Sequence, residues 1–185
     1  MQKRIHELNT SRFLYNDHET GRSVLEAMEE ELLHCEEFQI SVAFITEGGM
    51  RLLKPAFKEL EKRMVRGRIL TTDYQNISEP RALLELDQFR NIELRIFGAR
   101  ENKTGFHTKG YLFRRKGIYR IIIGSSNMTS PALTKNKEWN IRFISTEQGE
   151  VLQNIQREYE KMWDSSMSLQ EWLDHHPAKK SIDKR

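Results

Sequence analysis

Short apolar runs alternate with amphipathic segments through the first half of the chain, and this alternation limits the fold more than any other feature. The runs are rich in β-branched and aromatic residues, as buried strands are: FQISVAFIT (38–46), GRILTTDY (67–74) and IELRIFG (92–98). Segments with apolar residues at helical spacing lie before and between them, at 21–34, 50–64 and 78–89. Ser78 is expected as an N-cap, with Pro80 in the first turn. The pattern predicts βαβ units and a mostly parallel sheet.

The second half of the chain has a different rhythm, because its strand-like runs lack long helices between them. These runs are FHTKGYLFRR (106–115), IYRIIIGSS (118–126) and EWNIRFIST (138–146). Lys116-Gly117 predicts a tight hairpin turn between the first two. Residues 147–164 read as a helix whose apolar stripe comprises Val151, Ile155, Tyr159 and Trp163. The sequence therefore predicts an α/β fold, with a mixed β-sheet flanked by helices on both faces.

Length and composition indicate one globular domain with a modest positive charge. The 185 residues suggest a single domain over 1–185, with its core at about 21–164. A polar C-terminal tail at 165–185 would suit a boundary before a further domain. The net charge of +3 permits a polyanionic partner without requiring one. A single cysteine, Cys35, forms no internal disulfide or Cys-rich zinc site, and we expect it to be buried. We expect a cytoplasmic protein without membrane contact, because no signal-like or membrane-spanning run is present.

Polar residues gather at the ends of the two hairpin strands. Residues i and i+2 of a strand face the same side, so His107 and Lys109 should project together. The returning strand ends at Ser125 and Asn127, which should lie beside His107. A cation, two hydrogen-bond donors and an imidazole suit a phosphodiester. The simpler interpretation is a surface histidine. Because no carboxylate cluster or zinc spacing accompanies the set, any hydrolysis should need neither metal nor other cofactor.

These residues resemble a known signature. His107-Thr-Lys109 followed by Gly124-Ser125-Ser126-Asn127 is similar to the H-x-K…G-S-x-N motif of the phospholipase D superfamily, the HKD-type enzymes. Glu138 stands where small nucleases of the superfamily also have a glutamate. More narrowly, the chain resembles phospholipase D-like domains at the N-terminus of bacterial DEAD/DEAH-type helicases. It departs from the signature at Arg114, where the superfamily places an aspartate.

The resemblance implies a mechanism with two copies of the motif in one active site. One histidine attacks phosphorus and forms a phosphohistidine, and the other protonates the leaving oxygen. This chain has one copy, so the resemblance implies a homodimer with His107 from each subunit. Lys109, Ser125 and Asn127 would hold the phosphate, and Glu138 would orient or charge a histidine. The alternative for Glu138 is a strand-edge carboxylate paired with Lys137 or Arg142.

Basic residues near the motif could attract a nucleic-acid backbone if they lie on the rim of the site. They are Arg114, Arg115, Lys116 and Arg120 around the hairpin, Lys135 and Lys137 before Glu138, and Arg100 and Lys103. The alternative is that they form ordinary solvated turns. Phe106, Tyr111 and Phe113 should pack under the sheet.

Three functions stay open: a metal-independent DNA nuclease or phosphodiesterase, a catalytically weak nucleic-acid-binding or dimerisation module of a larger helicase, and, less favoured, a phospholipase.

Overall fold

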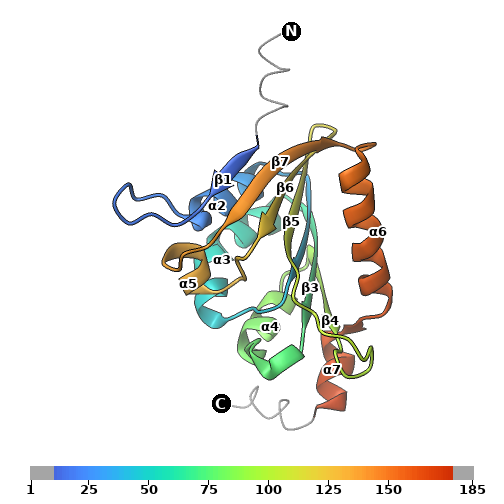
Figure 1. Ribbon diagram of the computed structural model, residues 1–185. Helices are drawn as coiled ribbons and strands as arrows, with labels where there is room; N and C mark the ends of the chain where they lie inside the picture. Colours follow the sequence, from blue (N-terminus) through green and yellow to red (C-terminus); the bar gives the residue numbers. More distant parts are fainter. Residues whose placement is uncertain (1–10, 177–185) are drawn as a thin grey trace.

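The computed structural model describes residues 11–176 and builds them around one eight-stranded sheet (Figure 1). The spatial order of the strands is β1-β7-β6-β5-β2-β3-β4-β8. The strands are β1 (Arg12–Leu14), β2 (Glu37–Val42), β3 (Arg66–Thr72), β4 (Ile92–Phe97), β5 (Lys109–Arg115), β6 (Ile118–Gly124), β7 (Asn140–Thr146) and β8 (Met167–Ser168).

Helices cover both faces of the sheet, as the sequence predicts. They are α2 (Val24–His34), α3 (Glu47–Lys62), the 3-10 turn η1 (Tyr74–Asn76), α4 (Pro80–Asp87), α5 (Ser130–Thr134), α6 (Glu150–Asp164) and α7 (Leu169–His175). Figure 1 shows α6 on one face and α2, α3, α4 and α5 on the other, with α7 below α6 at the β4 side of the sheet. The expected mixed α/β sheet is therefore confirmed.

The direction of the strands changes at β5. Strands β2, β3 and β4 are parallel neighbours connected through α3 and α4, whereas β5, β6 and β7 run antiparallel to their neighbours. Lys116 and Gly117 both have positive φ angles, 51° and 75°, between the paired residues Arg115 and Ile118. Positive φ at both central residues is the geometry of a two-residue hairpin turn. The predicted tight turn is confirmed, and it fixes where β6 ends relative to the start of β5.

Local capping sets where the helices begin. Ser23 forms a capping box with Glu26 at the start of α2. The prediction for Ser78 is wrong: Glu79 is the N-cap of α4, and Pro80 is its first residue. The Ser78 side chain is buried, where its hydroxyl donates to the Ala43 carbonyl oxygen and accepts from the Ile45 amide. This residue therefore connects the chain leaving β2 to the start of α4.

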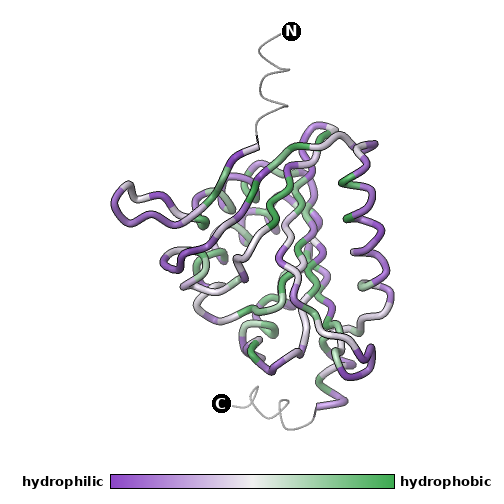
Figure 2. The backbone as a smooth tube through the Cα atoms, in the orientation of Figure 1, coloured by the Kyte–Doolittle hydropathy of each residue, from purple (hydrophilic) through white to green (hydrophobic). Residues whose placement is uncertain are grey.

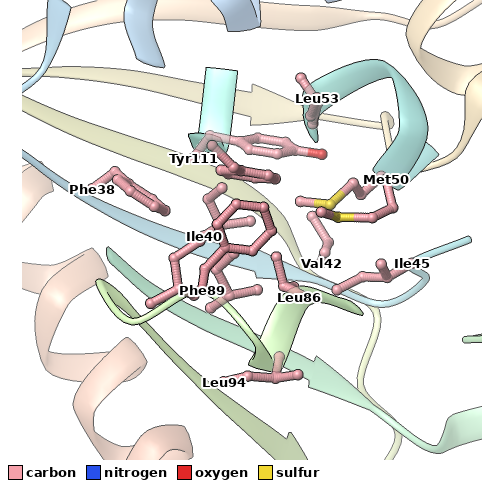
Figure 3. Packing of buried hydrophobic residues seen from close by; sticks show 14 of the residues in the cluster. Phe38, Ile40, Val42, Ile45, Met50, Leu53, Leu86, Phe89, Leu94 and Tyr111 are labelled. Carbon is pink, nitrogen blue, oxygen red and sulfur yellow. The ribbon is translucent and has the colours of Figure 1, made fainter. Parts of the chain in front are cut away.

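The core fills the space between the sheet and the helices (Figure 3). Phe106, Tyr111 and Phe113 are buried as expected, and Cys35 is buried directly after α2, where burial raises the pKa of its thiol to about 12. Figure 2 shows α6 as a mainly hydrophilic helix with isolated hydrophobic positions. The predicted α6 stripe is correct for Tyr159 and Trp163 but wrong for Val151, which is 56% exposed. Leu152 is buried instead.

Two segments outside the expected core belong to the fold. At the N-terminal end, β1 pairs with β7 through Phe13 and Ile141. At the C-terminal end, β8 joins the sheet edge and α7 buries Trp172 and Leu173. The prediction of a polar tail from residue 165 is therefore wrong up to residue 176, because the apolar residues of this short segment complete the core beside β4 and α4. The remainder of that tail, 177–185, lies outside the described residues.

Candidate active site

His107 lies two residues before the start of β5, and bonds of the intervening Thr108 hold the backbone next to it. The Ala43 amide donates to the Thr108 carbonyl oxygen at 3.1 Å, and the hydroxyls of Ser41 and Thr108 are 2.6 Å apart. His107 is exposed and Lys109 is only 8% exposed. Lys109 Nζ lies 2.7 Å from His107 Nδ1 and donates to the His107 carbonyl oxygen at 2.9 Å. The predicted meeting of these two side chains therefore occurs.

The surroundings of Lys109 lower its pKa, and the contact of its ammonium group with His107 sets the tautomer of the neutral imidazole. Burial lowers the pKa of Lys109, and the nearby carboxylate of Glu138 opposes that shift. An ammonium group has only donors, so Nδ1 accepts in this contact and the proton of a neutral ring stands on Nε2. The His107 ring also meets Phe44 edge-on, with centroids 5.8 Å apart. The imidazole is thus held on two sides while remaining exposed to solvent.

The turn after β6 holds the second half of the site. The Ser125 hydroxyl donates to Glu138 Oε2 and accepts from the Trp139 amide at 3.0 Å, while the Ser125 amide donates to the Trp139 carbonyl oxygen at 3.1 Å. Gly124 is required for this close approach, because an added Cβ would collide with the Trp139 carbonyl oxygen. The glycine of the motif therefore allows the two strand ends to meet.

Asn140, for which the sequence predicts no role, holds the turn through two hydrogen bonds to Ser126. Its Oδ1 accepts from the Ser126 amide at 3.2 Å, and its Nδ2 donates to the Ser126 hydroxyl at 2.9 Å. The Tyr111 hydroxyl donates to the Ser126 carbonyl oxygen at 2.8 Å. All three residues are almost completely buried. An asparagine that begins an apolar strand was the available signal, since a buried amide must find hydrogen-bond partners.

Asn127 is oriented by the loop that follows β2. Its Oδ1 accepts from the Phe44 amide at 3.1 Å, which directs the amide nitrogen of Asn127 away from that contact as a donor. The next residue, Met128, donates to the Phe44 carbonyl oxygen at 3.1 Å and accepts from Thr46 at 3.1 Å. The turn is therefore fastened to the start of α3.

The five residues expected to do chemistry lie at one edge of the sheet. His107 contacts Lys109, Ser125 contacts Glu138, and Glu138 lies close enough to influence Lys109. Asn127 is connected to this group through Phe44, whose amide donates to Asn127 Oδ1 and whose ring meets the His107 ring edge-on. The alternative pairing of Glu138 with Arg142 is wrong, because Arg142 binds Glu31 at 2.8 Å.

A groove of 520 Å³ opens beside His107 between the sheet and α6. Gly110 lies on its sheet side, and an added Cβ there would meet open space. Ile123 lines the groove from β6, and Ile155 and Met162 line it from α6.

Within residues 11–176, no group of three or more His, Cys, Asp or Glu side chains is arranged to hold a metal ion. The same residues include no helix with the length and hydropathy needed to cross a membrane.

The hairpin cations do not lie on the rim of this site, so that part of the prediction is wrong. Arg114, Arg115 and Lys116 are at the far end of β5 from Lys109, roughly 20 Å away along a seven-residue strand. Arg114 Nε donates to Glu147 at 3.0 Å. Arg120 faces α2, with Nη1 at 3.5 Å from the buried Glu31.

The remaining cations divide between two places. Lys135 and Lys137 are exposed in the loop that leads to Glu138. Arg100 and Lys103 line a different cavity, of 670 Å³, together with Tyr74 and the chain after β3 and β4. Of the predicted cations, Lys135 and Lys137 are therefore the two in the loop that leads to Glu138, the partner of Ser125.

Comparison with known proteins identifies the class of this fold. The family model described as "Cardiolipin synthase, PLD-like domain" matches residues 30–163, so the chain belongs to this family of phospholipase D-like domains. NucT from Helicobacter pylori is 17% identical with a TM-score of 0.66, over 86% of this chain and 98% of that one. Nuc from Salmonella typhimurium, described as a phospholipase D family member, is also 17% identical, with a TM-score of 0.62 over 86% and 97%.

A larger structure shows the same fold. Phosphatidylserine synthase from Haemophilus influenzae Rd KW20 is 14% identical with a TM-score of 0.64, over 93% of this chain and 47% of the synthase. At these identities the structural likeness establishes the fold alone. No curated protein sequence matches the chain.

Proposed function

We propose that the protein is a metal-independent phosphodiesterase that cleaves DNA. The observation that supports this most is the convergence of His107, Lys109, Ser125, Asn127 and Glu138 at one sheet edge. Lys135 and Lys137 add positive charge beside that edge, which favours a polyanionic substrate. Membership in the phospholipase D-like family is consistent with chemistry at a phosphodiester.

Each residue has a role that follows from its chemistry. Lys109 contributes charge, and Asn127 contributes amide N–H donors, toward the non-bridging oxygens. The Ser125 hydroxyl, which now donates to Glu138, would turn toward the same oxygens when a phosphate is present. His107 is the nucleophile in one subunit and the general acid and base in the other. Glu138 orients the serine and stabilises positive charge on Lys109 and the imidazoles.

The contact between Lys109 and His107 suggests the order of events. While Lys109 donates to Nδ1, the neutral ring carries its proton on Nε2, so Nε2 is not yet free to attack phosphorus. A bound phosphate would draw Lys109 away and free Nδ1 to take up that proton. Nε2 of this neutral imidazole would then attack phosphorus, and the bond to the leaving oxygen would break as the second imidazole, which starts doubly protonated, gives that oxygen a proton and becomes neutral. Water, deprotonated by this second imidazole, would later release the phosphate from the histidine.

The proposed site spans a homodimer. The printed sequence contains one H-x-K motif, at His107, whereas the mechanism requires two imidazoles. The exposed position of His107 allows a second copy to approach it. We retain the proposal that a helicase domain accompanies this one in the full-length protein; its support is the sequence resemblance alone.

The alternative function is a catalytically weak binding or dimerisation module. Two features leave room for it: Arg114, which replaces the signature aspartate, and the single H-x-K motif of the chain. Arg114 binds Glu147 at the far end of β5, so this replacement does not disturb the five site residues. We therefore favour the enzyme.

Cleavage of single- and double-stranded DNA in excess EDTA tests the proposal. Wild-type protein should cleave, and His107→Ala should abolish cleavage while DNA binding is retained. His18→Ala is the matched control, because this exposed histidine lies between β1 and α2 and should cleave normally. DNA binding by wild type without cleavage would favour the module, and cleavage that stops in EDTA would refute the metal-free mechanism. Sedimentation should give twice the 22.0 kDa chain mass.

A further inference from the structure

Three aromatic rings follow one another across the surface beside the phosphate-binding turn. Tyr15 stacks on Phe13 with centroids 5.4 Å apart, and Phe13 meets Trp139 edge-on at 5.8 Å. Trp139 is 74% exposed and Phe13 is 53% exposed. Tryptophan is highly buried on average in folded proteins, so such exposure beside a second aromatic ring indicates a ligand surface.

The backbone of Trp139 is rigidly connected to the site. Its amide and carbonyl groups both bond Ser125, and the preceding residue is Glu138. The exposed ring is therefore held next to the hydroxyl that we assign to the substrate phosphate. A nucleotide whose phosphate occupies the site would have its base within reach of this surface.

The charge around the rings matches the same ligand. Lys135 and Lys137 are exposed in the loop immediately before Trp139. Flat aromatic surfaces combined with cations are how proteins bind single-stranded nucleic acid, because every unpaired base offers a face for stacking. In a duplex those faces are covered by neighbouring bases.

We propose that Trp139 and Phe13 form a stacking platform for unpaired bases next to the scissile phosphate. The proposal rests on the proposed function for the choice of nucleic acid as ligand. It assigns a preference for single strands that the catalytic motif alone does not provide.

A binding experiment in the His107→Ala background separates stacking from chemistry. Affinities for an oligo-dT strand and for an abasic strand of equal length are measured by fluorescence anisotropy. Trp139→Ala should weaken dT binding by roughly five- to 150-fold, the range for loss of one stacked base. The abasic strand should change less than about twofold, and Trp139→Tyr should restore most of the dT affinity.

Trp139→Leu is the decisive comparison, because leucine keeps an apolar side chain but cannot stack. It should bind dT as weakly as Trp139→Ala. Equal loss on both strands, or normal dT binding by Trp139→Leu, would overturn the proposal. A drop in sedimenting mass together with equal losses would instead identify an interface between two copies. Absence of cleavage by the wild type would contradict the proposed function without affecting this comparison.

Intrinsic fluorescence provides a second readout. The two other tryptophans, Trp163 and Trp172, are only 5% and 1% exposed. Quenching by oligo-dT should therefore come mainly from Trp139 and should disappear in Trp139→Leu. Quenching that persists in this variant would count against stacking at Trp139.

Discussion

Asn140 offers a direct test of how the turn formed by residues 124–127 is held. Replacing it by alanine removes the acceptor of the Ser126 amide and the donor to the Ser126 hydroxyl. Asn140 and Ser126 are both almost fully buried, so water cannot replace these bonds without rearrangement. Two bonds at about 1 kcal/mol each, with a further cost of about 1–3 kcal/mol for a buried amide left without an acceptor, give a loss of about 3–5 kcal/mol in the free energy of unfolding.

Urea denaturation of wild type and variants measures this loss. Asn140→Asp is the matched comparison, because it keeps an acceptor for the Ser126 amide and the Ser126 hydroxyl can turn to donate to it. The aspartate variant should therefore retain more stability than Asn140→Ala. DNA cleavage should fall in Asn140→Ala because Ser125 is no longer positioned. A loss below about 0.5 kcal/mol in Asn140→Ala, with normal cleavage, would refute this account of the turn.

Three further predictions concern single residues. Lys109→Met should lower kcat by about 100- to 1,000-fold with the fold intact. Because burial lowers the pKa of Lys109, wild-type cleavage should also decline as the pH rises, and the decline should begin at a pH below 10.5, the ordinary pKa of lysine. Glu31→Ala should cost about 3–5 kcal/mol of stability in urea denaturation, because it removes the buried carboxylate that pairs with the buried Arg142 and the half-buried Arg120 and leaves Arg142 only the longer contact to Glu30; a loss below about 1 kcal/mol would contradict this. Lys137→Ala should reduce the salt slope of DNA binding by about 1, whereas Arg115→Ala should leave it unchanged; equal effects would contradict the assignment of the rim.

The parts of the fold that the sequence predicts are those set by local patterns. Alternating strand and helix patterns indicated the parallel half of the sheet, and Lys116-Gly117 indicated the hairpin. The same hairpin brings the end of β6 back to the start of β5, where Ile123 pairs with Gly110. Periodicity could not reveal β1 or the burial of Trp172, because both depend on contacts with distant segments rather than on their own short sequences.

The sequence indicated the motif residues of the candidate site but not the residues that hold them in place. His107 and Lys109 meet because residues two apart in an extended chain share a side. The role of Asn140 required knowing that β7 begins beside Ser126. The hairpin arginines appeared close to the site in sequence, yet strand length carries them to the opposite end of the sheet. Closeness in the sequence therefore predicted the wrong position for the hairpin arginines, because the length of β5 separates them from the site.

Hydrolysis of a small chromogenic phosphodiester in excess EDTA tests the central claim most directly. Such a substrate has neither a base nor a polymer backbone, so it reports the chemistry at His107 without the surrounding binding surface. The account predicts EDTA-resistant hydrolysis by the wild type that is lost in His107→Ala and retained in His18→Ala. Equal hydrolysis by the wild type and His107→Ala would contradict the assignment of His107 as the reacting group.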